Sequence, residues 1–235
     1  MTAERAGSRP AARPYRSPGR REQARRTRRG ILEAARAQFL ARGYAGTTVR
    51  AVAELAGVSV PTVEQAFGTK SALLREVIDV AIAGDHEPVA VLDRPWAAEA
   101  SATEDVAGFL DRVATVLAEA QQRSARLVVV ALEAADVDPS LRPLADDRLA
   151  QRARTAEWIV DGMTARAALR PGIDRAHAVD TVWLLMEPVV FLRLTEERGW
   201  SVQRYRDWFA DSAQRLLLSG GGLSPGSPPG ETLVP

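Results

Sequence analysis

The segment from Thr47 to Val63 reads TTVRAVAELAGVSVPTV, and it predicts two short helices joined by a tight turn. Either Thr47 or Thr48 is a suitable N-cap for the first helix, because a threonine hydroxyl can accept a hydrogen bond from a backbone N–H of the first turn. The apolar residues that follow have the i, i+3, i+4, i+7 spacing of one helix face: Val49, Val52, Ala53 and Ala56.

The turn between the two helices is only a few residues long. Gly57 can adopt the positive φ that ends the first helix. Ser59 is an N-cap for the second helix, and Pro61 falls in its first turn, where the missing N–H is tolerated. Helices joined this tightly match the helix-turn-helix motif, whose second helix enters the major groove of DNA. The alternative is an ordinary αα-hairpin that contacts no DNA.

Amphipathic helices are expected on both sides of this motif. The upstream helix, which should stop at Gly43-Tyr44, has an apolar stripe of Ile31, Leu32, Ala35, Phe39 and Leu40. Downstream, Phe67-Gly68-Thr69-Lys70 leads into a helix whose apolar face contains Leu73, Leu74, Val77, Ile78 and Ala81.

Three short helices followed by a long one resemble the DNA-binding domain of the TetR family of bacterial repressors. The positions that carry the resemblance lie between Ile31 and Ile78: Ala34, Ala35, Phe39, Gly43-Tyr44, Thr47-Thr48-Val49, Ala56-Gly57-Val58-Ser59, Thr62, Phe67, Lys70 and Leu73-Leu74. The resemblance implies an all-α fold. An N-terminal three-helix helix-turn-helix domain would be followed by a helical-bundle domain for ligand binding and dimerisation.

Charge is distributed unevenly along the chain. Residues 1–70 contain 14 basic and 5 acidic residues, a net charge of +9, whereas residues 71–235 contain 17 basic and 25 acidic residues, a net charge of −8. A basic head on an acidic body is suited to DNA binding, because only the head is attracted to phosphate.

Composition argues against several other classes of protein. The chain has no cysteine and only two histidines, His86 and His177, which are far apart, so we expect no disulfide, metal site or cofactor. We find no catalytic arrangement of residues and expect no enzyme activity. No apolar run is long enough to cross a bilayer, and the Arg-rich N-terminus lacks the apolar core of a secretory signal, so we expect a cytoplasmic protein.

Four segments are predicted along the chain. They are a disordered Arg-rich tail at 1–21, the helix-turn-helix domain at 22–70, a helical effector-binding and dimerisation domain at 71–218, and a flexible tail at 219–235. In the body we expect helices that begin at Ser101 or Thr103, that cover Leu127–Ala135, and that run from about Leu144 to Leu169. Two more should span Asp174–Arg198 and Ser201–Leu218.

The predicted helix Asp174–Arg198 is apolar on nearly every side and must therefore be buried on nearly every side. In the TetR family the last two long helices pair with those of a second subunit, which implies a homodimer here. The interface residues implied are Val182, Trp183, Val190, Tyr205, Trp208 and Phe209. A buried central helix in a monomer is the alternative.

The DNA contacts are expected near the start of the second helix of the motif. The predicted residues are Arg25, Arg26, Thr48, Arg50, Ser59, Val60, Pro61, Thr62, Glu64, Gln65 and Lys70. Gln65 can pair with adenine, and Val60 or Pro61 can touch a thymine methyl, whereas Thr48 and the arginines suit phosphate. Lys70, the only lysine, is interpreted as a phosphate contact or as a solvated surface residue. Glu64 stands where relatives usually carry tyrosine, so a carboxylate replaces a hydroxyl that contacts phosphate. The sequence therefore does not predict the DNA affinity or the operator sequence.

An apolar effector pocket is expected inside the body, with Glu187 as a polar anchor. Its predicted lining is Phe109, Val113, Leu132, Trp158, Met163, Met186 and Glu187, although each of these residues could equally belong to the core. The sequence as a whole predicts a transcriptional regulator, a repressor by resemblance, that binds a pseudo-palindromic duplex as a homodimer and is released by a small apolar effector. The alternative is a helical ligand- or protein-binding module with a degenerate DNA-binding head.

Overall fold

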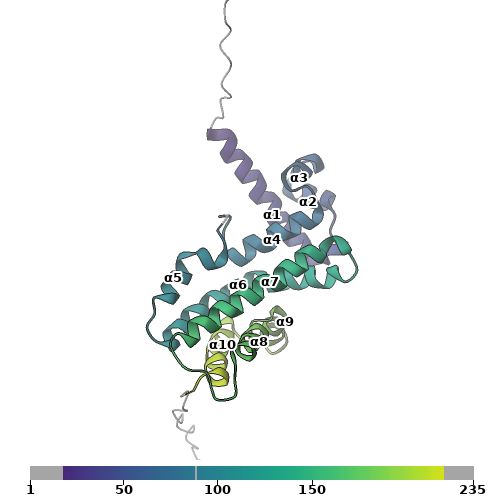
Figure 1. The fold of residues 1–235 in the computed structure, drawn as a ribbon. Helices are drawn as coiled ribbons and strands as arrows, with labels where there is room; N and C mark the ends of the chain where they lie inside the picture. The colour runs from purple at the N-terminus through teal and green to yellow at the C-terminus, as the bar shows by residue number, and fades with distance from the viewer. Residues whose placement is uncertain (1–17, 88, 220–235) are drawn as a thin grey trace, which may run out of the picture.

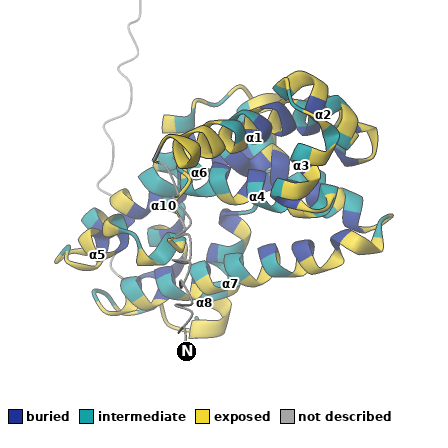
Figure 2. Ribbon diagram, turned by 90° about the horizontal axis from the view of Figure 1, so that it is seen from above, coloured by how far each residue is buried: buried dark blue, intermediate teal, exposed yellow. Residues whose placement is uncertain are grey.

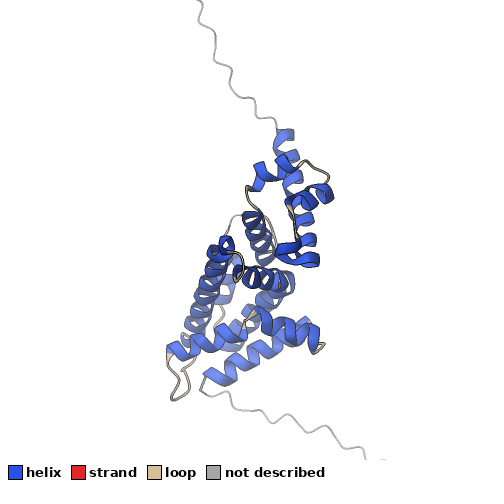
Figure 3. Cartoon of the chain, turned by 90° about the vertical axis from the view of Figure 1, so that its right-hand side faces the viewer, coloured by secondary structure: helices blue, strands red, loops and turns tan. Residues whose placement is uncertain are grey.

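The computed structural model describes residues 18–87 and 89–219, which form an all-α fold (Figures 1 and 3). The α-helices are α1 (Pro18–Gly46), α2 (Val49–Ala56), α3 (Val60–Phe67), α4 (Lys70–Ala83), α5 (Pro95–Ser101), α6 (Val106–Ala135), α7 (Arg142–Thr164), α8 (Arg175–Leu185), α9 (Pro188–Leu192) and α10 (Val202–Leu217). Short turns of other helix types are η1 (Val91–Asp93), η2 (Pro139–Leu141) and the π-helical η3 (Arg193–Glu197). In the described ranges no helix is both long enough and apolar enough to cross a membrane.

The structure confirms the predicted signals of the helix-turn-helix motif. Thr48 is the N-cap of α2, and its hydroxyl oxygen accepts a hydrogen bond from the N–H of Ala51 at 3.1 Å. Gly57 ends α2 with a φ of 66°. Ser59 caps α3 by accepting from the N–H of Thr62 at 3.3 Å. The chain therefore turns between α2 and α3 where its local sequence predicts.

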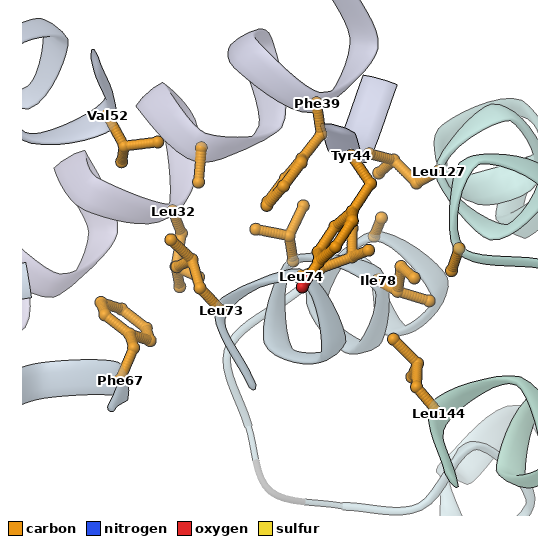
Figure 4. Close-up of a cluster of buried hydrophobic side chains, with 14 of the residues drawn as sticks. Leu32, Phe39, Tyr44, Val52, Phe67, Leu73, Leu74, Ile78, Leu127 and Leu144 are labelled. Atoms are coloured by element: carbon orange, nitrogen blue, oxygen red, sulfur yellow. The ribbon is translucent and has the colours of Figure 1, made fainter. Parts of the chain in front are cut away.

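The head and part of the body share one hydrophobic core. α4 buries the five residues predicted for its apolar face, and Leu74 and Ile78 are fully buried. Figure 4 shows these side chains between Phe39 of α1, Leu127 of α6 and Leu144 of α7. α4 packs against α1 of the head and also against α6 of the body. The domain boundary predicted at residue 70 therefore passes through a core that the head and the body share.

The two predicted tails lie mostly outside the described residues. α1 begins at Pro18, so residues 18–21 of the predicted N-terminal tail are helical, with the remainder of that tail undescribed. At the other end, the N–H of Ser219 donates to the carbonyl of Ala168 at 3.0 Å, and residues 220–235 lie outside the description.

The body contains one long helix where two were predicted. α6 begins after Asp105, which accepts from the N–H of Gly108 at 2.8 Å, rather than at Ser101 or Thr103. It continues without a break to Ala135. The polar stretch near its centre is rich in Ala, Glu, Gln and Arg, which favour helix, so a loss of apolar residues there does not end the helix.

The prediction of one continuous helix over Asp174–Arg198 is also wrong, because the structure has two separate α-helices, α8 and α9, in this range. α8 ends at Leu185, and α9 begins at Pro188, which is the first residue of that helix. Glu187 is extended, with φ −64° and ψ 127°. A residue before proline is disfavoured in the helical conformation, and proline has no N–H for the preceding turn. Proline thus ends the helix within an otherwise apolar run.

Candidate DNA-binding and effector sites

The second helix of the motif, α3, has one buried and one exposed side (Figure 2). Val63 and Phe67 are buried in the shared core. The exposed residues are Ser59, Pro61, Glu64 and Gln65, and the half-buried ones are Val60 and Thr62. The structure thus gathers the predicted α3 residues on the accessible side of one short helix. The Thr62 hydroxyl lies 2.8 Å from that of Ser59, so these two groups already share one hydrogen bond.

The predicted phosphate contacts at the start of α2 are at the surface. Thr48 and Arg50 are both exposed. The Arg50 guanidinium donates to Glu54 at 2.9 Å, and this hydrogen bond raises the pKa of Arg50. Both side chains are largely exposed, and such surface pairs are weak. Arg50 is therefore accessible to another anion.

The arginines of α1 differ in their environment. Arg25 and Arg26 are exposed, and Arg26 lies 3.6 Å from Glu22 one turn earlier. Arg28 is instead part of the fold. Its guanidinium donates to Glu76 at 2.9 Å and to the Ala66 carbonyl at 2.8 Å. It ties α1 to α3 and α4, an internal role that the basic composition of this segment did not indicate.

Lys70 is neither a solvated side chain nor an unpaired cation. Its Nζ donates to the carbonyls of Tyr44 at 2.9 Å and Thr47 at 3.1 Å, and it lies 4.0 Å from the centre of the Tyr44 ring. These carbonyls lie at the C-terminal end of α1 and just after it, where the helix dipole attracts a cation, and the Tyr44 carbonyl also accepts from the N–H of Thr47 at 3.2 Å. Lys70 therefore joins the end of α1 to the start of α4, which explains its position without DNA. An ammonium group has three donors, so one is left for another acceptor.

A cavity of about 1440 Å³ lies between α1, α4, α6, α7 and residues 85–87 and 89–92. Its apolar lining includes Trp96, Val113, Val116, Leu117, Val128, Leu132, Ile159 and Met186. Of the seven predicted residues, Val113, Leu132 and Met186 line it. At this size and composition the cavity can hold a drug-sized apolar molecule.

The remaining predicted lining residues lie elsewhere. Phe109 and Met163 are fully buried in the core formed by α6, α7, α8 and α10, and Trp158 packs against Phe109 with ring centres 5.6 Å apart. Gly162 of α7 has no side chain, so the Phe109 ring of α6 packs directly against its backbone and the two helices approach closely. These residues belong to the packed core beside the cavity and do not line it.

Glu187, the predicted polar anchor, is paired with Arg152 of α7 behind the cavity wall. Arg152 is itself a lining residue, and its guanidinium lies 3.8 Å from the centre of the Trp183 ring. Removing either charge would leave the other buried and unpaired, a strongly destabilising change. Glu187 thus holds the arginine that faces the cavity.

A second buried arginine, Arg148, lies one turn earlier on α7. Its side chain is 5% exposed and donates to Asp79 of α4 at 2.7 Å and to Asp147 at 2.6 Å. The hydrogen bond from Arg148 lowers the pKa of Asp147, against the opposing effect of burial. Neither arginine was predicted from the sequence, because charges at these positions resemble a solvated helix face until their tertiary partners are known.

The predicted dimer residues divide into two groups. Val182, Tyr205 and Phe209 are fully buried within their own chain and cannot meet a second subunit, so their assignment to an interface was wrong. Burial raises the pKa of the Tyr205 phenol, whose hydroxyl donates to the carbonyl of Leu185 at 3.1 Å. The other three, Trp183, Val190 and Trp208, are partly exposed.

The exposed apolar residues nearby were not predicted. Leu184 of α8 is 58% exposed and Leu216 of α10 is 47% exposed, and these two helices are in contact. The helical period contained the signal for Leu184, which lies off the stripe of α8 that faces the core. It contained none for Leu216, which has the helical phase of the buried Tyr205 and Phe209 but lies near the end of α10. Within the described ranges no group of three or more His, Cys, Asp or Glu side chains is placed to hold a metal ion.

Comparisons with known proteins agree with this geometry. Residues 31–77 match the model of bacterial regulatory proteins, tetR family. None of the curated proteins matches the chain by sequence.

Solved structures share the fold over most of the chain. NalD of Pseudomonas aeruginosa, the secondary repressor of the MexAB-OprM multidrug efflux pump, matches with a TM-score of 0.60 and 20% identity, over 85% of this chain and 100% of its own. The ketosteroid transcriptional regulator KstR2 of Mycobacterium tuberculosis matches with a TM-score of 0.57 and 19% identity, over 82% and 95% of the two chains. A regulator from Saccharomonospora viridis, solved with choline, matches with a TM-score of 0.60 and 21% identity, over 82% and 97%. Residues 31–77 thus match the model of the tetR family of bacterial regulatory proteins, and the described chain shares its fold with solved structures of TetR-family transcriptional regulators.

Proposed function

We propose that this protein represses transcription by binding, as a homodimer, to a pseudo-palindromic DNA operator. The observation that carries the proposal is the accessible side of α3, where Pro61, Glu64 and Gln65 are exposed at the start of a short, capped helix. The net charge of +9 on residues 1–70 supports it, because phosphate binding contributes affinity for any duplex. A two-fold dimer would place two such helices on half-sites about one helical turn apart.

A small apolar molecule in the cavity is proposed to release the protein from DNA. The cavity is large, mostly apolar and adjacent to α4, which also packs against α1 of the head. Among structures of similar fold, one is described as a ketosteroid regulator and another was solved with choline, so the chemistry of bound molecules differs between these proteins. A DNA-bound regulator of this kind would work in the cytoplasm and carry out no catalysis.

The dimer is proposed to form through the outer faces of α8 and α10. Leu184 and Leu216 are exposed there, and Trp183 and Trp208 are half-buried. An apolar surface on adjacent helices is typical of an interface between subunits. This proposal retains the predicted helices but uses their outward residues.

Selection of bound sequences from random DNA tests the DNA-binding proposal. We expect an inverted repeat to be enriched and its affinity to fall steeply as salt rises, since each phosphate contact releases counterions. Equal binding to all sequences at physiological salt would contradict operator recognition. Release of the selected operator by an apolar compound would support the effector proposal.

A second candidate is a ligand- or protein-binding module whose head no longer binds DNA. Glu64 favours it, because an exposed carboxylate on α3 would lie near phosphates in a DNA complex. No enrichment of any sequence by a folded, dimeric protein would support this candidate over the first.

A further inference from the structure

Three N–H groups around the cavity have no hydrogen-bond partner. They are Nε of Arg148, Nε of Arg152 and Nε1 of Trp96, all on residues that line the cavity. The side chains of Arg148 and Arg152 are 5% and 10% exposed. Buried polar groups in folded proteins nearly always have a partner, so three unpaired groups at one cavity point to a partner that the chain does not supply.

The missing partner must be a hydrogen-bond acceptor. All three unpaired groups at the cavity are donors. Among the described residues the buried acceptor without a partner is Oε1 of Gln38, which does not line the cavity. A ligand that offered only donors, such as an alkylammonium ion, would leave all three N–H groups unpaired.

We propose that the cavity binds a molecule with an apolar body and a carboxylate or carbonyl oxygen that accepts hydrogen bonds from Arg148 and Arg152. This inference rests on the proposed function only in assigning the effector to this cavity. The two arginines are four residues apart on α7 and lie on the same face of the helix. The apolar body would contact Val113, Leu132 and Met186.

The charges of the wall favour an acceptor over a cation. Arg148 is paired with Asp79 and Asp147, and Arg152 with Glu187. Of the other acidic lining residues, Glu76 is paired with Arg28 and Asp85 with Arg94, and Glu87 is exposed to solvent. A cationic ligand would therefore have to compete with guanidinium groups for the carboxylates beside Arg148 and Arg152. An anionic or carbonyl oxygen needs no carboxylate, because each guanidinium has five donors and uses only part of them here.

Binding of the acceptor would affect α4. All three unpaired N–H groups are covered by neighbouring atoms, so the side chains of Trp96, Arg148 and Arg152 must turn to present them to a ligand. Turning would strain the 2.7 Å contact of Arg148 with Asp79, which lies beside the buried Ile78 on α4. An acceptor at Arg148 therefore competes with the contact between α7 and α4.

The experiment compares three probes of matched chain length on the full-length protein by isothermal titration calorimetry: decanoate, decan-2-one and decylamine, each below its micellar concentration. We expect decanoate to bind at least about tenfold more tightly than decylamine, because charge-assisted hydrogen bonds are lost with the amine. Binding of decan-2-one close to that of decanoate would show that an oxygen acceptor suffices. Much weaker binding of the ketone would show that the ligand is an anion.

Variants of α7 locate the contact. Arg152→Met should weaken decanoate binding by about tenfold or more, whereas Arg154→Met, an exposed arginine at the rim on the same helix, should change it by less than about twofold. Arg148→Lys keeps the charge and should also weaken binding, and circular dichroism checks that each variant is folded.

Equal effects of Arg152→Met and Arg154→Met would overturn the proposal, as would tighter binding of decylamine. Failure of all three probes to bind would also overturn it. Because operator selection needs no ligand, DNA binding would be judged separately in each of these cases.

Discussion

Replacement of Gly162 by alanine tests how closely α6 and α7 approach below the cavity. A Cβ atom at this position would overlap Cζ of Phe109 and lie only 2.7 and 2.9 Å from the two Cε atoms of that ring. The ring cannot withdraw freely, because it is fully buried, packs against Trp158 and lies 4.5 Å below the guanidinium carbon of Arg166. The alanine must therefore displace either the ring or the helix.

The magnitude follows from two opposing effects. Overpacking a core by one methyl group costs about 1–3 kcal/mol. Alanine is favoured over glycine inside a helix by about 0.5–1 kcal/mol. For Gly162→Ala we expect a net loss of up to about 2.5 kcal/mol in the free energy of unfolding. The matched control is Gly30→Ala in α1, where a Cβ would meet nothing within 4 Å, and which should gain up to about 1 kcal/mol.

The assay is urea unfolding followed by circular dichroism, with all variants at one protein concentration because dimerisation would add to apparent stability. The double variant Gly162→Ala, Phe109→Leu adds a second check. Its loss should be smaller than the sum of the two single losses, since the shorter side chain makes room for the methyl group. If Gly162→Ala stabilises the protein as Gly30→Ala does, the close approach of α6 and α7 is refuted.

Four further predictions concern the head, the surface and the segment beside the cavity. Glu64→Gln should tighten binding to the selected operator and to a scrambled duplex alike; a loss of about 1–3 kcal/mol on the operator alone would instead show that this carboxylate reads a base. Leu184→Glu should weaken dimerisation in analytical ultracentrifugation with the fold intact, whereas Val182→Asp, in the core, should unfold the chain in circular dichroism; equal dimerisation of Leu184→Glu and wild type would exclude this face. Lys70→Met should lower the free energy of unfolding by about 1–3 kcal/mol in urea, because two carbonyls lose a charged donor, and an unchanged value would mean that water replaces it. Asp85 is paired with Arg94, which donates to its carboxylate at 3.0 Å, and this hydrogen bond lowers the pKa of Asp85 from 3.8 to about 2. The ion pair should therefore persist as pH falls through 3.8 and be lost near 2; a carboxyl NMR midpoint near 3.8 would contradict this.

The helix-turn-helix motif was predictable because its signals act over a few residues. The N-caps Thr48 and Ser59 bond to N–H groups three residues ahead, and Gly57 needs only its own φ. Such contacts are encoded within the segment that they shape. The apolar face of α4 was equally predictable, since its five apolar residues recur with the helical period and all five are buried.

The body was less predictable because its decisive contacts join distant segments. The apolar pattern of residues 174–198 outweighed the local signal of Pro188, which divides the helix. The same pattern marked Val182 as buried without saying whether its own chain or a second subunit covers it. The role of Arg148 as a buried ion-pair partner could not be predicted, because its partner Asp79 is distant in sequence.

Because Lys70 is the only lysine of the chain, the reactivity of its amine can report on the conformation of the DNA-binding head. An amine-reactive reagent has one side-chain target, the Nζ of Lys70, besides the N-terminal amino group. That target is held against the Tyr44 ring and two carbonyls at the junction of α1 and α4. Its acylation rate therefore measures how often this junction opens, without any engineered label. Comparison of that rate with and without operator DNA would show whether the third donor of the ammonium group also meets phosphate.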